Sequence, residues 1–380
     1  MTRSAGRGRK YLIDATMIRG GGGFTHLVNT VPELVLQAPE DHFRVLCGSE
    51  RVAAALPTAP NLDVVSLGEM GLRERFRFTY LGAARYAKQW GADLYFSASE
   101  MAPLNAPCPT IAAFQNANVT NMGRGQSLTP KQKLRFRLLN RIARFTARRV
   151  DRALFVSDWA AGEMGEALGI PEARRAAIPH GIDPTRWRRD PEAEAQLQPY
   201  ILAVSSIYPY KNYVRLIEAY AELARQGDTP DLVIVGDNQD EQHYQDMLAA
   251  REATGEVAEQ IYIVGEVSYD EVHDFYKNAS LFVFPSWLES FGIPLLEAMA
   301  SDTPIVASDL PVFREIARDA ALYADPHDPK AIAGAMAEAL YVPGAARQLV
   351  KAGRERLREY TWQRSASQLL ALFRDTVAAR

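Results

Sequence analysis

Cysteine is scarce in this chain, with only Cys47 and Cys108 among 380 residues. Both lie in or beside apolar segments, so we expect two reduced, partly buried thiols of a cytosolic protein and no disulfide framework. Long apolar runs are missing too: no stretch reaches the roughly 20 residues that span a bilayer. Residues 1–9 lack the apolar run of a signal peptide and are expected to form a disordered tail.

Metal-binding and nucleic-acid-binding signals are also missing. None of the six histidines pairs with another at metal-ligand spacing, and no Asp-X-Asp triplet occurs. The sequence therefore predicts no metal site and no metal cofactor. The formal net charge of −3 provides no overall field that would attract nucleic acid.

What the sequence does contain is a regular alternation of short apolar runs with longer helical patterns. Continuous apolar runs are typical of parallel strands buried on both faces, and eleven of them are too many for one sheet. We predict an α/β protein with two Rossmann-like, doubly wound parallel sheets. The predicted strands are 11–15, 43–47, 62–66, 93–97, 110–114, 153–157, 200–205, 231–236, 260–265, 281–285 and 304–308.

The most informative segment is 281–308, which is predicted to form a strand, a loop, a helix and a second strand. Pro294 suits the first turn of a helix, which places Glu297 in that turn and Glu289 in the loop before it. The free amides near Phe291, Gly292 and Ile293 form a potential anion site. Amides for phosphate oxygens and two carboxylates for sugar hydroxyls suit a diphosphate sugar. Alternatively, Glu297 only complements the helix dipole and Glu289 is a solvated loop residue.

This segment resembles a known family. Glu289 and Glu297 are eight residues apart in the frame FPS-x-x-E-S-F-G-x-P-x-x-E-A-M, which is similar to the E-x7-E signature of retaining glycosyltransferase family 4. The resemblance implies the GT-B fold, with two Rossmann-like domains and an interdomain cleft. It places Glu289 against the donor sugar, Glu297 on the ribose hydroxyls, and the backbone from Ser290 to Ile293 at the diphosphate and sugar.

The resemblance extends to two further donor-binding positions. Lys211 lies on a predicted strand-to-helix loop and would pair with the donor diphosphate, although a lone loop lysine is usually only solvated. Ser206 stands where the family often has an arginine, so fewer charges would hold the diphosphate.

In the first half, the resemblance assigns a glycine-rich loop and a position near the reacting sugar. Gly22 and Gly23 belong to a run of four glycines after the first predicted strand, a weak match to a nicotinamide-binding fingerprint and alternatively a flexible turn. Asn116 follows the strand at 110–114, where many relatives have a histidine or His-Asp. It cannot act as a base but can donate a hydrogen bond to a sugar oxygen. Asx-type turn chemistry is the other interpretation of Asn116.

The family pattern also indicates the domain boundaries. We expect an acceptor-binding domain at 1–190, a nucleotide-sugar-binding domain at 191–362, and a final helix at 363–380 that packs back on the first domain. Residues 180–199 are rich in proline and charge, which favours a domain boundary there.

One segment stands out by its charge. Residues 131–149 contain eight lysines and arginines with apolar residues between them. The pattern is typical of a solvated helix with a basic outer face. It also fits a patch that contacts anionic lipid headgroups or a phosphorylated acceptor, on the inner face of the membrane.

Taken together, the motifs predict a metal-independent glycosyltransferase. It would transfer a hexosyl group, with retention, from a nucleoside diphosphate sugar to a glycan, a lipid-linked or a small-molecule acceptor. GDP-mannose is mildly preferred as donor, and a UDP-sugar is an alternative. The proposed catalytic residues are Lys211, Glu289 and Asn116. Two other functions stay open: a GT-B epimerase or hydrolase of nucleotide sugars, and a non-catalytic protein that binds them.

Overall fold

The computed structural model describes residues 8–121, 130–187 and 199–380 and divides into two compact units. The N-terminal unit comprises Met1–Gly181 and Trp362–Arg380, and the C-terminal unit comprises Ile182–Thr361. The expected boundary after residue 190 falls in 188–198, which lies outside the described residues, as does most of the expected tail at 1–9.

The N-terminal unit has a parallel seven-stranded sheet in its described part, in the order β3-β2-β1-β4-β5-β6-β7. Six of these strands agree with the predicted ones to within two residues. The seventh, Arg175–Ala177, was not predicted because it has only three residues, all partly exposed. The strands are β1 (Lys10–Ala15), β2 (His42–Cys47), β3 (Leu62–Ser66), β4 (Leu94–Ser97), β5 (Thr110–Ala113), β6 (Arg152–Phe155) and β7 (Arg175–Ala177).

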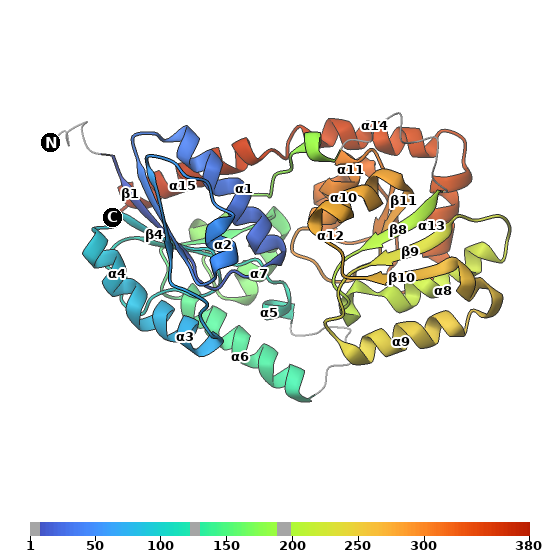
Figure 1. The fold of residues 1–380 in the computed structure, drawn as a ribbon, viewed down its shortest axis with the longest axis horizontal. Coiled ribbons are helices and arrows are strands. Elements are labelled where there is room, and N and C mark those ends of the chain that lie inside the picture. Colours follow the sequence, from blue (N-terminus) through green and yellow to red (C-terminus); the bar gives the residue numbers. More distant parts are fainter. Residues whose placement is uncertain (1–7, 122–129, 188–198) are drawn as a thin grey trace. The chain divides into compact units, whose positions relative to one another are not determined.

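Helices lie on both sides of this sheet (Figure 1). Tyr11 and Ile13 of β1 are buried in a core that also contains Leu369 and Phe373 of the last helix. The Phe373 ring lies 5.2 Å from that of Tyr11, so the C-terminal helix packs on the N-terminal sheet. The helices are α1 (Gly21–Gln37), α2 (Glu50–Ala54), α3 (Leu72–Arg77), α4 (Ala83–Trp90), α5 (Asn118–Asn121), α6 (Pro130–Ala147), α7 (Asp158–Ala167) and α15 (Trp362–Ala378).

The C-terminal unit has a parallel six-stranded sheet in its described part, in the order β10-β9-β8-β11-β12-β13. Five strands agree with the prediction to within two residues, and the three-residue edge strand Leu322–Ala324 was not predicted. The strands are β8 (Tyr200–Val204), β9 (Asp231–Val235), β10 (Ile261–Gly265), β11 (Ala279–Phe284), β12 (Ile305–Ser308) and β13 (Leu322–Ala324).

The position of β8 beside β11 determines where the candidate site forms. The two strands pair in parallel, with Leu281 opposite Ile201. Because the carboxyl ends of parallel strands meet at one edge, the loop after β8 lies next to the loop after β11. The helices of this unit are α8 (Tyr213–Ala224), α9 (Glu241–Glu252), α10 (Tyr269–Asn278), α11 (Ile293–Ala300), α12 (Pro311–Ala317), α13 (Pro329–Tyr341) and α14 (Ala345–Leu357).

Candidate active site

The loop between β8 and α8 carries Lys211 at the end of a short 3₁₀ helix, Pro209–Lys211. The next residue, Asn212, has the left-handed conformation (φ 64°) that asparagine tolerates better than most residues. Its buried side-chain Nδ2 donates to the carbonyl of Pro285 (3.0 Å) and to that of Pro326 (2.7 Å). Asn212 therefore fixes the lysine loop to two other loops at the same edge of the sheet.

Lys211 forms an ion pair with Glu289, the first acid of the E-x7-E frame. Lys211 Nζ donates to Glu289 Oε1 at 2.5 Å, and only 12% and 15% of the two side chains are exposed. Lys211 Nζ also lies 5.4 Å from the centre of the Phe284 ring. Two residues that the sequence placed in one site, 78 positions apart, are thus in direct contact.

Helix α11 begins at a glycine that no other residue could replace without strain. Gly292 caps the helix with φ 101°, and a Cβ atom there would lie 2.9 Å from Phe313 Cε1. Pro294 has no N–H, and the Leu295 N–H donates to the Gly292 carbonyl. Within the described chain, no carbonyl accepts from the N–H groups of Gly292 or Ile293. These amides remain available for an anion at the helix start.

Glu297 lies farther along α11 than the sequence analysis placed it. It is the fifth helical residue, and the first turn of α11 has no acid, because the helix already begins at Ile293, one residue before Pro294. The side chain of Glu297 is buried, 8% exposed, and burial raises its pKa from 4.5 to about 7, against a smaller lowering by the Tyr276 hydroxyl. A simple dipole partner would be exposed in the first turn, so the structure does not favour that interpretation.

The other predicted donor-binding residues of the C-terminal unit lie on the same two loops. Ser206 is partly exposed between β8 and the 3₁₀ helix, and Ser290 is partly exposed beside Glu289. Phe291 is buried, with its ring against that of Tyr360. These residues lie with Lys211 and Glu289 on the loops at one edge of one sheet, and Glu297 lies on α11, the helix that follows the second loop.

The predicted residues of the N-terminal unit follow β1 and β5. Gly22 and Gly23, expected in a loop, lie in the first turn of α1 because the helix begins at Gly21. Asn116 is exposed, and its Oδ1 accepts from the Asn118 amide, which is the Asx-type turn that the sequence analysis left open. Gly22, Gly23 and Asn116 belong to the N-terminal unit, whereas Lys211 and the two glutamates belong to the C-terminal unit.

Sequence reasoning missed two residues that hold these loops. Asn212 follows Lys211 directly and precedes a helix, a signal for a helix cap that could have been used. Glu100 accepts from the backbone amides of Gln115 (3.2 Å) and Asn116 (3.0 Å) through Oε1. Nothing in the sequence around Glu100 marks it, because its partners follow a different strand.

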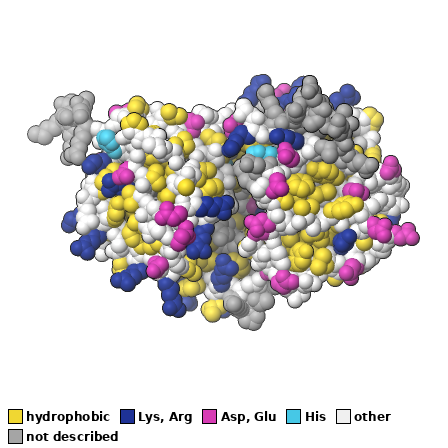
Figure 2. Space-filling view, viewed as in Figure 1, with side chains coloured by type: hydrophobic (Ala, Val, Ile, Leu, Met, Phe, Trp, Pro, Cys, Tyr) yellow, Lys and Arg dark blue, Asp and Glu magenta, His cyan; other side chains and the backbone are white. Residues whose placement is uncertain are grey.

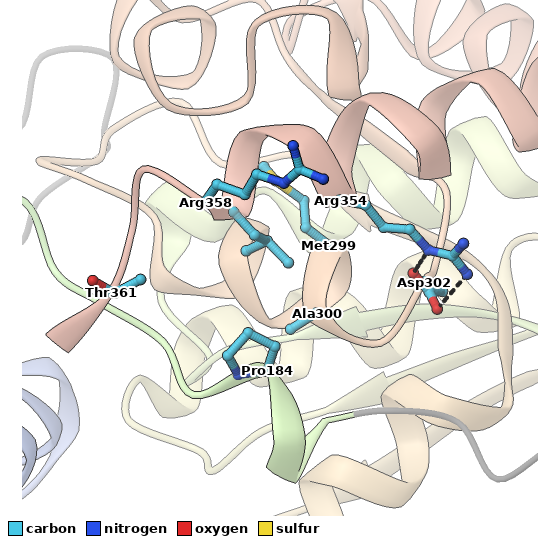
Figure 3. Close-up of a pocket in the computed structure, with 8 residues that line it drawn as sticks. Pro184, Met299, Ala300, Asp302, Arg354, Arg358 and Thr361 are labelled. Carbon is cyan, nitrogen blue, oxygen red and sulfur yellow. Dashed lines mark hydrogen bonds and ion pairs between the residues drawn. The ribbon is translucent and has the colours of Figure 1, made fainter. Parts of the chain in front are cut away.

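A separate hollow of about 710 Å³ lies at the other end of α11, beside Met299 and Ala300. Figure 3 shows Arg354 directed at Asp302 there, with bonds of 2.7 and 2.8 Å to the two carboxylate oxygens. None of the predicted site residues lines this hollow. An eight-residue helix is about 12 Å long, so the hollow is distinct from the helix start.

Among the described residues, no group of three or more His, Cys, Asp or Glu side chains lies close enough together to hold a metal ion. No helix in the described ranges has both the length and the apolar character to cross a membrane.

Comparisons with known proteins agree with the fold and with the family that the motifs resemble. Residues 186–356 match the family described as Glycosyl transferases group 1, and residues 20–186 match Glycosyltransferase Family 4. O-antigen chain mannosyltransferase RfbU of Salmonella typhimurium is 30% identical over 56% of this chain and 57% of its own length. Phosphatidyl-myo-inositol mannosyltransferase of Mycobacterium leprae is 28% identical over 87% of this chain and 89% of its own length.

Solved structures show the same fold. Alr3699/HepE of Anabaena, in complex with UDP-glucose, superposes with a TM-score of 0.76 at 14% identity, covering 98% of this chain and all of that one. Sucrose-phosphate synthase of Thermosynechococcus elongatus has a TM-score of 0.72 at 20% identity, with 98% and 100% coverage. The two family matches together extend from residue 20 to 356, so this chain belongs to glycosyltransferase family 4 and is a glycosyltransferase with the GT-B fold.

Proposed function

We propose that this enzyme transfers a hexosyl group, with retention at the anomeric carbon, from a nucleoside diphosphate sugar to a hydroxyl of a glycan, a lipid-linked or a small-molecule acceptor. The observation that carries the proposal is the contact of Lys211 with Glu289 beside the free amides at the start of α11. GDP-mannose is the preferred donor, because two of the relatives are named as mannosyltransferases. A UDP-sugar is the alternative, since a structural neighbour contains UDP-glucose.

In the donor site, Lys211 and the amides of Gly292 and Ile293 stabilise the charge that builds on the departing diphosphate. Glu289 accepts hydrogen bonds from the donor sugar, and Glu297 accepts them from the ribose hydroxyls. Lys211 is paired with Glu289, and in this proposal donor binding exchanges the partners: the diphosphate replaces Glu289 on the lysine, and sugar hydroxyls replace the lysine on Glu289.

Proton transfer needs no side-chain base in this proposal. Asn116 has no basic group, so the leaving phosphate oxygen takes the proton of the attacking acceptor hydroxyl, as the family resemblance implies. The side-chain amide of Asn116 and the backbone amides of Gly22 and Gly23, at the start of α1, donate hydrogen bonds to oxygens of the donor or the acceptor. Ser206, Ser290 and Phe291 complete the donor site through backbone and hydroxyl contacts, without a metal ion.

The test combines donor binding with transfer. A thermal-shift screen against GDP-, UDP- and dTDP-sugars identifies the donor, because a ligand that binds only the folded state raises the melting temperature. The donor is then incubated with octyl α-D-mannopyranoside and a panel of glycans, and proton NMR reads the anomeric configuration of the product. We expect a product of unchanged configuration. Donor consumption without any transfer would instead indicate an epimerase or hydrolase, and binding without turnover a non-catalytic protein.

We also propose that the acceptor side of the enzyme contacts an anionic membrane through α6. Leu134 and Leu138 are 69% and 57% exposed on this helix, and α6 contains no acid. Figure 2 shows lysine and arginine side chains gathered along the edge of the N-terminal unit where α6 lies in Figure 1. Exposed apolar side chains flanked by cations are typical of helices that lie in the membrane interface.

Vesicle sedimentation tests this contact. The protein should bind vesicles of equal parts phosphatidylcholine and phosphatidylglycerol, and should not bind phosphatidylcholine alone. Leu134→Ser with Leu138→Ser should weaken binding at least about 100-fold, because fully burying one leucine side chain contributes about 1.5–3 kcal/mol. The matched control is Tyr262→Ser with Val264→Ser, which removes two side chains that are 50% and 44% exposed on β10. Equal loss in both double variants would exclude α6 as the contact.

A further inference from the structure

Three neighbouring strands of the N-terminal sheet end at one edge, and the middle one carries a carboxylate that has no assigned role. The order β1-β4-β5 places the end of β4 between those of β1 and β5. The glycines of α1 follow β1, and Asn116 follows β5. Glu100 stands three residues after β4. Ligands of open parallel sheets bind outside the carboxyl ends of the strands, so Glu100 lies between the two segments already assigned to the site.

The contacts of Glu100 come from the backbone. Its carboxyl group accepts hydrogen bonds from the amides of Gln115, Asn116 and Glu100 itself. No lysine, arginine or histidine among the described residues forms an ion pair with it, unlike Glu289 in the C-terminal unit. A carboxylate offers about four lone-pair sites, so a hydrogen bond from a ligand hydroxyl can still be accommodated.

The surroundings of Glu100 favour a further hydrogen-bond donor. Burial raises the pKa of this carboxyl group above 4.5, and only the three amides oppose the rise. The residue nevertheless remains partly exposed to solvent, so a ligand can reach it. A carboxylate with no cation beside it is stabilised by any hydroxyl that donates to it, and hydrogen bonds to charged groups are the stronger ones.

We propose that Glu100 binds the acceptor: its carboxylate accepts a hydrogen bond from a hydroxyl of the incoming sugar or polyol and orients it, while its amide contacts hold the Gln115–Asn116 turn. The proposal rests on the proposed function and assigns Glu100 to its acceptor half. No covalent bond forms at Glu100, and the acceptor proton still leaves with the phosphate. The acceptor class is a neutral polyhydroxylated group, because an anionic group would be repelled by the carboxylate.

The decisive variant is Glu100→Gln, because its side-chain carbonyl still accepts from the Gln115 and Asn116 amides. Its NH₂ group, however, replaces the oxygen available to the acceptor hydroxyl. We expect an unchanged melting temperature and an unchanged thermal shift with GDP-mannose or UDP-glucose. The kcat/KM for octyl α-D-mannopyranoside should fall about 10- to 100-fold, the scale of one hydrogen bond to a charged group. Glu100→Asp, which keeps the charge, should recover part of this loss.

A role limited to holding the turn makes a different prediction. In that case Glu100→Gln transfers as wild type does, and only Glu100→Ala loses both stability and activity. Glu172→Gln, which changes an exposed carboxylate of the same unit, is the matched control and should have no effect. Transfer by Glu100→Gln within twofold of wild type would overturn the assignment and leave the proposed function intact. A wild-type enzyme that transfers to no acceptor would overturn both.

Discussion

The candidate residues of the two units are held in different ways. In the C-terminal unit, the side chains of Lys211 and Glu289 contact each other directly. In the N-terminal unit, Asn116 is held through its backbone amide by Glu100. A site built from side-chain contacts requires particular residue types at particular positions, which a sequence motif can indicate. Backbone contacts can be made by almost any residue, so they produce no such motif. This difference explains why the donor half could be read from the sequence more easily than the acceptor half.

One buried titratable group from each unit provides a second comparison. Burial lowers the pKa of His26 from 6.5 to about 4 in the N-terminal unit, whereas it raises the pKa of Glu297 to about 7 in the C-terminal unit. The His26 ring is packed against His180, with 3.2 Å between their Nδ1 atoms, and against Trp362 at the start of α15. Burial favours the neutral form of each group. Because His26 is a base and Glu297 an acid, their contributions to stability should change with pH in opposite directions.

The largest expected effect tests the direct side-chain contact in the donor half. Lys211→Ala should lower kcat at least about 100-fold, because it removes a donor that stabilises charge on the leaving diphosphate. The control is Lys330→Ala, which changes an exposed lysine of the same unit. Steady-state kinetics on both purified, folded variants measure the effect, and wild-type turnover in Lys211→Ala would remove this residue from the mechanism.

A smaller effect on stability tests the start of α11. Gly292→Ala should destabilise the protein by about 2–3 kcal/mol, since alanine is strained at φ 101° and its Cβ would approach Phe313. Gly334→Ala is the matched control: this glycine lies within α13 and a Cβ there meets no atom within 4 Å. Because alanine is the better helix former, the control should be neutral or stabilising by up to about 1 kcal/mol. Equal urea unfolding curves for the two variants would contradict the close packing around Gly292.

Two profiles of stability against pH sharpen the comparison of His26 with Glu297. In the unfolded chain His26 binds a proton below about pH 6.5 but in the folded unit only below about pH 4, so stability should fall by about 2 kcal/mol from about pH 7 to about pH 5. His26→Gln should reduce this loss of stability at acid pH. His42→Gln, which changes an exposed histidine of the same unit, should keep it, as measured by urea unfolding. Identical losses of stability at acid pH in the two variants would show that His26 is not held neutral.

For Glu297, the contribution to stability should change with pH in the opposite direction. The folded carboxyl remains neutral up to about pH 7 while the unfolded one ionises near pH 4.5, so its contribution to stability should fall by about 2 kcal/mol from about pH 5.5 to about pH 7.5. Glu297→Gln should abolish this loss, and Glu338→Gln, at an exposed site on α13, should not.

If ribose hydroxyls donate to the ionised form, donor affinity should rise about tenfold from about pH 6 to about pH 8. Flat affinity over this range would argue against the ribose contact.

The smallest effect concerns the partner exchange of Lys211. Glu289→Gln should slow transfer but tighten the binding of GDP alone by roughly three- to tenfold, because it frees the lysine and removes a negative charge beside the diphosphate. Isothermal titration calorimetry with GDP measures this change in affinity. Weaker binding of GDP would mean that Glu289 and the diphosphate do not compete for Lys211.

Physical reasons explain which elements could be predicted from the sequence. Central strands such as β1 and β11 are continuous apolar runs because both faces are buried, and their ends were placed within two residues. The edge strands β7 and β13 have three residues and no such run. The place of Glu297 within α11 depends on the helix starting at Ile293, and a residue pattern fixes a helix end only to within one or two residues. Glu100 could be found only from the order of the strands, which brings the ends of β4 and β5 together.

The most direct test of the central claim is a crystal structure of the enzyme with the donor that the thermal-shift screen identifies. The account predicts diphosphate oxygens within hydrogen-bond distance of Lys211 Nζ and of the Gly292 and Ile293 amides, with Glu289 turned from the lysine to the sugar. A diphosphate bound elsewhere, with the Lys211–Glu289 pair intact, would contradict it.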